Sequence, residues 1–66
     1  MRVILYLERF ADLGETCLLS EKVGLTGIET TPEHDVIMGD IDSRIANQLT
    51  KVKGVSHILK GQHAVL

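Results

Sequence analysis

Two short stretches of the chain are apolar at almost every position. The first is VILYL at residues 3–7, and the second is DVIMGDI at residues 35–41. Unbroken apolar runs of this length are typical of strands in the middle of a sheet, with helices on at least one side. We therefore expect two central strands, each with both faces buried.

The segments next to the second run are more polar. IETT at residues 28–31 is β-branched and half polar, which is typical of an edge strand. Pro32 and Glu33 separate it from the second central strand, and proline suits the first central position of a turn. These two strands are therefore expected to form a hairpin. The last strand is expected at residues 57–59, with an extension as far as Val65.

Residues 43–53 have the clearest helical pattern in the chain. Ile45, Leu49 and Val52 recur at i, i+4 and i+7, so they form one apolar stripe on an α-helix. The pattern predicts that this helix packs on the sheet through the stripe.

Residues at both ends of this segment support the same helix. Asp42 or Ser43 can accept hydrogen bonds from its first amides. Gly54 stands where a left-handed residue often ends a helix, and Val55 can fold back onto the last turn. The helix is therefore expected to stop at Lys53.

Residues 11–24 allow two interpretations. A helix capped by Asp12 places four apolar residues roughly on one side, namely Leu13, Cys17, Leu18 and Leu25. Leu19 and Val23 then fall on the opposite side, where they are candidates for a self-association contact. The alternative is a strand over residues 16–20 that forms a hairpin with the first strand. We expect the helix.

The expected order of elements is strand, helix, strand, strand, helix, strand, in a single domain over residues 1–66. This order is typical of the ferredoxin-like split βαβ fold (βαββαβ), an α+β architecture. In that fold two helices cover one face of a four-stranded antiparallel sheet, and strands one and three occupy its middle. The two apolar runs are the first and third strands, so the hydrophobic pattern agrees with the topology.

The length of 66 residues limits the size of the hydrophobic core. A chain of this size buries about 60% of its unfolded surface, and small domains often depend on oligomers, metals or disulfides. Cys17 is the only cysteine, which excludes an internal disulfide and favours a reducing compartment. We find no signal-peptide pattern and no apolar run near the ~20 residues of a membrane span. We therefore expect a cytoplasmic location and no membrane partner, unless the chain is cut from a larger precursor.

Charge is distributed unevenly along the chain. Residues 1–42 carry nine acidic and three basic side chains, a net charge of −6, whereas residues 43–66 carry four basic side chains and no acid. Such asymmetry can steer a partner or a head-to-tail association, but we favour the explanation that the second helix and last strand present a solvated basic face. Tyr6 and Phe10 are the only aromatic residues, so we do not expect nucleic acid as a partner.

The polar residues do not form a pattern typical of catalysis or metal binding. His57 and His63 would lie roughly 20 Å apart on a regular strand, too far to share a metal ion. Asp40 and Asp42 could bind a hard cation together with Asp35, but capping and solvation explain them at a strand end. No glycine-rich phosphate loop is present, and so small a chain has little room for a pocket. We therefore expect no catalytic residue, no metal, no cofactor and no enzymatic activity.

The second half of the chain has a spacing found in a known family. The likeness is carried by Ile41, Ile45-Ala46, Leu49, Gly54-Val55 and Ile58. These positions resemble the second half of the subtilisin-propeptide and peptidase-inhibitor family of small ferredoxin-like domains. The chain departs from that family at residues 36–37, where a Gly-aromatic pair is frequent. It departs again at residues 59–62, where acids associated with protease docking are typical.

This resemblance implies a non-enzymatic protein-binding module, either a peptidase inhibitor or a propeptide-like chaperone with a subtilisin-like protease as its partner. The sheet would pack on helices of the protease, and the C-terminal tail would enter its active-site cleft. The residues of that tail are Gln62, His63, Ala64, Val65 and Leu66. The competing explanation is that they only complete the last strand.

The same helix-Gly-Val-strand signature also resembles small ligand-sensing domains of the ACT and RAM types, and fold analogy alone does not choose between the functions. This second likeness implies a homodimeric regulatory domain that binds a small ligand between its subunits, which small size favours. A third alternative is an adaptor subunit of a larger complex.

Overall fold

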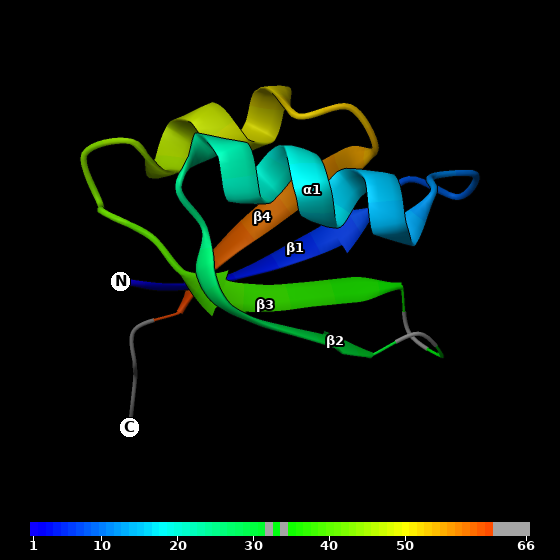
Figure 1. Ribbon diagram of the computed structural model, residues 1–66, viewed down its shortest axis with the longest axis horizontal. Helices are drawn as coiled ribbons and strands as arrows, with labels where there is room; N and C mark the ends of the chain where they lie inside the picture. Colours follow the sequence, from blue (N-terminus) through cyan, green and yellow to red (C-terminus); the bar gives the residue numbers. More distant parts are fainter. Residues whose placement is uncertain (32, 34, 62–66) are drawn as a thin grey trace.

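The computed structural model describes residues 1–31, 33 and 35–61. Its elements are β1 (Arg2–Leu7), α1 (Leu13–Val23), β2 (Thr26–Thr31), β3 (Val36–Asp40), the 3₁₀ helix η2 (Ala46–Lys51) and β4 (Val55–Gly61). The strands form one antiparallel sheet in the order β2-β3-β1-β4 (Figure 1). The expected small α+β domain, with a four-stranded antiparallel sheet and two helical segments, is therefore confirmed. As expected, β1 and β3 lie in the middle of the sheet.

The elements form two layers, with α1 and η2 over the same face of the sheet (Figure 1). The core lies between these layers. Its buried apolar residues are Val3, Leu5, Leu25, Ile37, Ile41, Ala46, Leu49 and Val55. Because successive strand side chains point to opposite faces, Val3 and Leu5 of β1 enter this core while Ile4 between them points away.

The helix expected within residues 11–24 is confirmed, and the strand alternative over residues 16–20 is wrong. α1 begins directly after Asp12, whose carboxylate accepts a hydrogen bond from the Glu15 amide at 3.0 Å. This bond satisfies one of the free amides of the first turn. Gly24 ends the helix, and its amide donates to the carbonyl oxygens of Ser20 and Glu21.

The side of α1 that faces the sheet differs from the expected one. Its fully buried residues are Thr16 and Ser20, whereas Leu18 is 61% exposed. Half-buried residues that pack on the core extend this side, namely Leu13, Cys17 and Val23. The prediction for Leu18 is wrong because small polar residues occupy the centre of the buried side. A pattern built on apolar residues does not detect them.

The second helix is shorter and tighter than expected. Residues 46–51 form a 3₁₀ helix, and the predicted α-helix over residues 43–53 is wrong. A 3₁₀ helix has about three residues per turn, so residues three apart lie above one another. Ala46 and Leu49 are buried, and Val52, three residues further on, is half-buried on the core. The apolar stripe therefore exists, but it is in a 3₁₀ register.

Asp42 accounts for the late start of η2. Its carboxylate accepts a hydrogen bond from the Arg44 amide at 2.8 Å, and its carbonyl accepts one from the Ile45 amide at 3.0 Å. A side chain that bonds the backbone two residues ahead stabilises a turn, which competes with a helix at the same place. Asp42 therefore stabilises a turn and does not cap a helix. Ile45 precedes η2 and provides no side-chain cap.

Gly54 joins η2 to β4 in the left-handed conformation that its position predicts, with φ of +97°. A Cβ atom at this residue would overlap Oγ1 of Thr16 on α1. The Thr16 hydroxyl also donates to the Lys53 carbonyl at 3.4 Å. The turn before β4 therefore lies directly against α1, and only glycine fits there without rearrangement.

Candidate functional site

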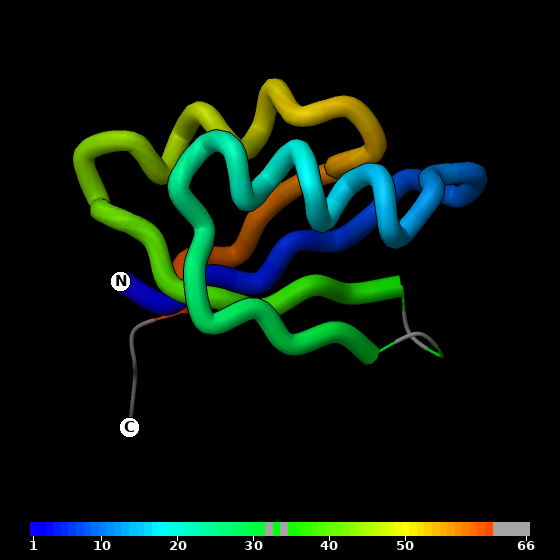
Figure 2. Tube along the Cα trace, viewed as in Figure 1, coloured from blue at the N-terminus to red at the C-terminus, as the bar shows by residue number. Residues whose placement is uncertain are grey.

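Among the described residues, no helix lies over the second face of the sheet. α1 and η2 lie on one side, and no other described segment crosses the opposite side (Figure 2). Val3 and Leu5 are fully buried beneath the helices, whereas Ile4 and Tyr6 are only half-buried. The expectation that both faces of the central strands are buried is therefore wrong, because the chain supplies a single helical layer.

The strand register identifies the side chains that share this second face, which we call the open face. Ile4 of β1 lies opposite Met38 of β3 on one side and opposite Leu59 of β4 on the other. Two positions along β1, Tyr6 lies opposite Val36. These five residues form an apolar centre that continues across three strands. Leu59 is its most accessible member, with 52% exposure.

A stacked pair of rings extends the open face toward the β4 edge. Tyr6 and His57 lie opposite each other on β1 and β4, with ring centroids 4.7 Å apart and planes inclined by 10°. The Nδ1 atom of His57 lies 3.3 Å from the Ser56 hydroxyl. His57 is exposed, as expected of a solvent-facing strand histidine. The pair adds a flat, rigid aromatic surface to the apolar centre.

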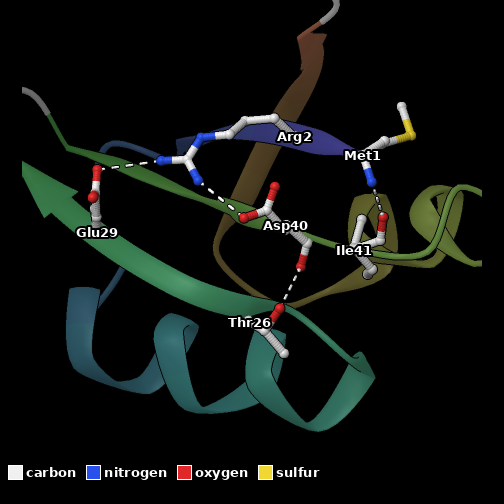
Figure 3. Close-up of polar contacts among 6 residues, drawn as sticks. All are labelled: Met1, Arg2, Thr26, Glu29, Asp40 and Ile41. Carbon is white, nitrogen blue, oxygen red and sulfur yellow. Dashed lines mark hydrogen bonds and ion pairs between the residues drawn. The ribbon is translucent and has the colours of Figure 1, made fainter.

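A charged border closes the open face at the end where β1 begins (Figure 3). Arg2 donates to the Asp40 carboxylate at 3.0 Å and to the Glu29 carboxylate at 3.3 Å, which joins β1 to β3 and β2. The Thr26 hydroxyl donates to the Asp40 carbonyl at 3.3 Å. All three charged side chains are partly exposed, so these ion pairs contribute little to stability, and their main effect is to fix the border in place.

Both ends of the described chain lie at this border. The amino group of Met1 donates to the Ile41 carbonyl at 2.7 Å, and the Ile41 amide donates to the Met1 carbonyl at 2.9 Å (Figure 3). Gly61, the last described residue of β4, lies opposite Arg2. The chain therefore leaves β4 beside the charged end of the open face.

The three aspartates considered for cation binding are not brought together as a ligand set. Asp40 pairs with Arg2, and Asp42 pairs with Arg44 at 2.8 Å. Hydrogen bonds from the Arg44 side chain, and then from its amide, hold the pKa of Asp42 below its ordinary value. Asp35 lies in the turn before β3 with φ of +51°. Within residues 1–31, 33 and 35–61, no three His, Cys, Asp or Glu side chains converge and no pocket is formed.

The remaining candidates on α1 lie apart from the open face. Cys17 is a half-buried thiol that packs on the core, as expected. Burial, and then the nearby Glu21 carboxylate, raise its pKa, which disfavours the reactive thiolate. Val23 also packs on the core, so it is not free on the outer side of α1 as the pattern suggested. Leu19 is half-buried.

The predicted tail lies outside the described residues. It consists of Gln62, His63, Ala64, Val65 and Leu66, and its role as a partner-binding segment stays a prediction. His34 and Pro32, in the predicted hairpin turn, also lie outside the described residues. The strands on either side of that turn pair with each other as predicted.

Comparisons with known proteins give no relative for this chain: no family model, no curated protein and no solved structure matches it. The described part of the chain contains no helix with the length and apolar character needed to cross a bilayer.

Sequence reasoning missed the open face, although the sequence contains a signal for it. The runs VILYL and VIMGD are apolar on both sides of their strands, but only two helical segments are available to cover them. Two short helical segments cover one face of a four-stranded sheet and leave the other uncovered. Counting the available layers would therefore have predicted an uncovered apolar face.

Proposed function

We propose that this chain is a ferredoxin-like, non-enzymatic protein-binding module that binds a partner protein on the open face. The strand order β2-β3-β1-β4, with two helical segments over one face, supports the ferredoxin-like assignment. The proposal includes the cytoplasmic setting in which a single thiol stays reduced.

The observation that carries the proposal is the apolar centre of the open face. Ile4, Val36 and Met38 are half-buried on the face of the sheet that no described helix covers, and Leu59 is 52% exposed beside them. Contiguous apolar surface on a small protein is typical of a protein-interaction site. The stacked Tyr6 ring supplies the kind of rigid aromatic contact that contributes strongly in interfaces.

The partner that fits best presents helices to the sheet and a cleft to the tail. Gly61 ends the described part of β4 at the charged end of the open face, so residues 62–66 start beside the docking surface. Five extended residues reach up to about 17 Å, enough to pass from the sheet into a neighbouring cleft. One partner can thus contact the face and the tail together. This is the arrangement implied by the resemblance to subtilisin propeptides and peptidase inhibitors.

The experiment measures inhibition of a subtilisin-type protease by the intact chain and by three variants. Met38→Lys places a charge in the apolar centre, and deletion of residues 62–66 removes the tail. Leu18→Lys is the matched control, because Leu18 is 61% exposed on α1, on the other side of the molecule. We expect inhibition by the intact chain and by Leu18→Lys, and a loss of at least about tenfold in the other two variants.

Two results would contradict this proposal in different ways. A folded intact chain that does not inhibit the protease removes the protease as the partner. Sedimentation that gives a dimer for the intact chain and a monomer for Met38→Lys would assign the open face to self-association, as in the regulatory-domain alternative. Circular dichroism of each variant separates these outcomes from a failure to fold.

A further inference from the structure

The two edge strands of the sheet differ in how well they could accept another strand. In β2 the register with β3 is interrupted between Thr26 and Glu29, and Gly27 between them has φ of +58°. Bulges of this kind distort an edge and hinder the addition of a strand. β4 instead pairs with β1 without interruption from His57 to Gly61. The regular edge of the sheet is therefore β4.

The outer side of β4 is unoccupied by any described strand. β1 is its neighbour on one side, and β4 ends the strand order on the other. Most side chains of β4 are exposed, namely those of Ser56, His57, Leu59 and Lys60. An edge strand presents backbone amides and carbonyls that can pair with an extended segment of another chain.

The charged residues near β4 indicate which kind of extended segment this edge would bind. Residues 43–61 carry four basic side chains and no acid, and one of these, Arg44, is neutralised by Asp42. Lys51 ends η2 and Lys53 lies two residues before β4, so both lie near the start of the edge in sequence. Glu8, whose amide donates to the Gly54 carbonyl, and the next residue, Arg9, have opposite charges and together add no net charge there.

We infer that the β4 edge accepts an acidic extended segment of another protein as a fifth strand of the sheet. Backbone pairing along β4 supplies the contact, and the exposed Lys51 and Lys53 at its start select negative charge. A second copy of this chain is a poorer occupant through its own β4, because that arrangement brings the two basic regions together. The β4 edge adjoins the open face through His57 and Leu59, but its contact is made by the backbone, and the inference does not depend on the proposed function.

The test uses synthetic seven-residue peptides, matched in length to β4, and the ¹⁵N-labelled chain. One peptide alternates glutamate with valine, and the other alternates lysine with valine. We expect the glutamate peptide to shift the amide resonances of residues 55–61 and of β1, more strongly at low salt than at high salt. The lysine peptide should leave these resonances unchanged.

Charge variants make the test sharper. The double variant Lys51→Glu/Lys53→Glu should bind the glutamate peptide at least about tenfold more weakly. Lys22→Glu, an exposed lysine on α1, is the matched control and should bind like the unmodified chain. The inference is overturned by equal shifts with both peptides, by shifts confined to β2 and β3, or by no shifts at millimolar peptide. Concentration-dependent shifts at β4 without peptide would also overturn it, because they assign the edge to a second copy.

Discussion

At the scale of single residues, the structure depends on small side chains at points of close approach. Thr16 and Ser20 are the fully buried residues of α1, and Gly54 lies against Thr16 where the chain turns into β4. A larger residue at any of these positions would separate the helical layer from the sheet, because interiors are close-packed and tolerate little added volume.

Replacing Gly54 with alanine should lower stability markedly. Its φ of +97° disfavours any residue with a Cβ atom, and that atom would also overlap the Thr16 hydroxyl. We expect a loss of about 2 kcal/mol or more in the free energy of unfolding, measured by urea denaturation. Gly14→Ala is the control, because Gly14 is exposed within α1 and has no close contact beyond an ordinary one with Asp12. Equal stability of both variants would contradict the close approach of α1 to the turn.

Asp42 should contribute a pH-dependent part of the stability. Arg44 holds the pKa of Asp42 below its ordinary value in the folded chain, so the ionised carboxylate favours folding. This contribution is present above the unfolded pKa of about 4 and is lost as the pH falls through the folded pKa. The difference in stability between the unmodified chain and Asp42→Asn should therefore shrink below about pH 4. A difference that stays constant down to the acid transition would show that Asp42 acts only through its turn geometry.

At the scale of elements, the strands could be predicted from the sequence better than the helices. Each of the four predicted strands is present, because unbroken or β-branched apolar runs determine them. η2 was predicted as an α-helix because its apolar residues fit a spacing of four as well as one of three. The turn bonds of Asp42, which favour the shorter helix, are local hydrogen bonds that hydrophobic periodicity does not reveal.

The buried side of α1 leads to a prediction about that element. The Ser20 hydroxyl is buried with no hydrogen-bond partner among the described residues, whereas the Thr16 hydroxyl donates to Lys53. Ser20→Ala should therefore stabilise the chain by about 1 kcal/mol, since it removes an unsatisfied polar group and raises helix propensity. Thr16→Val is the comparison and should be neutral or destabilising, because it loses a bond. Thermal or urea unfolding of the two variants measures the contrast, and a destabilised Ser20→Ala would show that the hydroxyl has a partner.

At the scale of the whole molecule, the candidate site is the face of the sheet that the two helical segments leave uncovered. The hydrophobic pattern predicts the strands that form the open face. It also predicts that the residues pointing to this face are buried, and that part is wrong. That error has a physical cause, because an apolar side chain on an uncovered face gives the same sequence pattern as one on a covered face. Ile4 and Met38 could be assigned to a surface only after the helices had been counted and placed.

Removal of β4 should unfold the entire chain. β1 pairs with β4 from Arg2 to Leu7 on one side and with β3 on the other, so β4 completes the central strand. A chain that ends at Gly54 is expected to lose the dispersed amide spectrum of a folded protein. A chain that ends at Gly61 should keep it, since the described sheet is then complete. A folded spectrum for the shorter chain would show that three strands suffice.

The pairing of the first strand with the last has a consequence for how the chain is made. Residues 2–7 leave the ribosome before residues 55–61, so β1 lacks its second neighbour until β4 has also emerged. Until then the nascent chain exposes an apolar strand with one unpaired side. Folding of the sheet is therefore expected to wait for β4, and the chain without β4 is the form most exposed to chaperones and to aggregation.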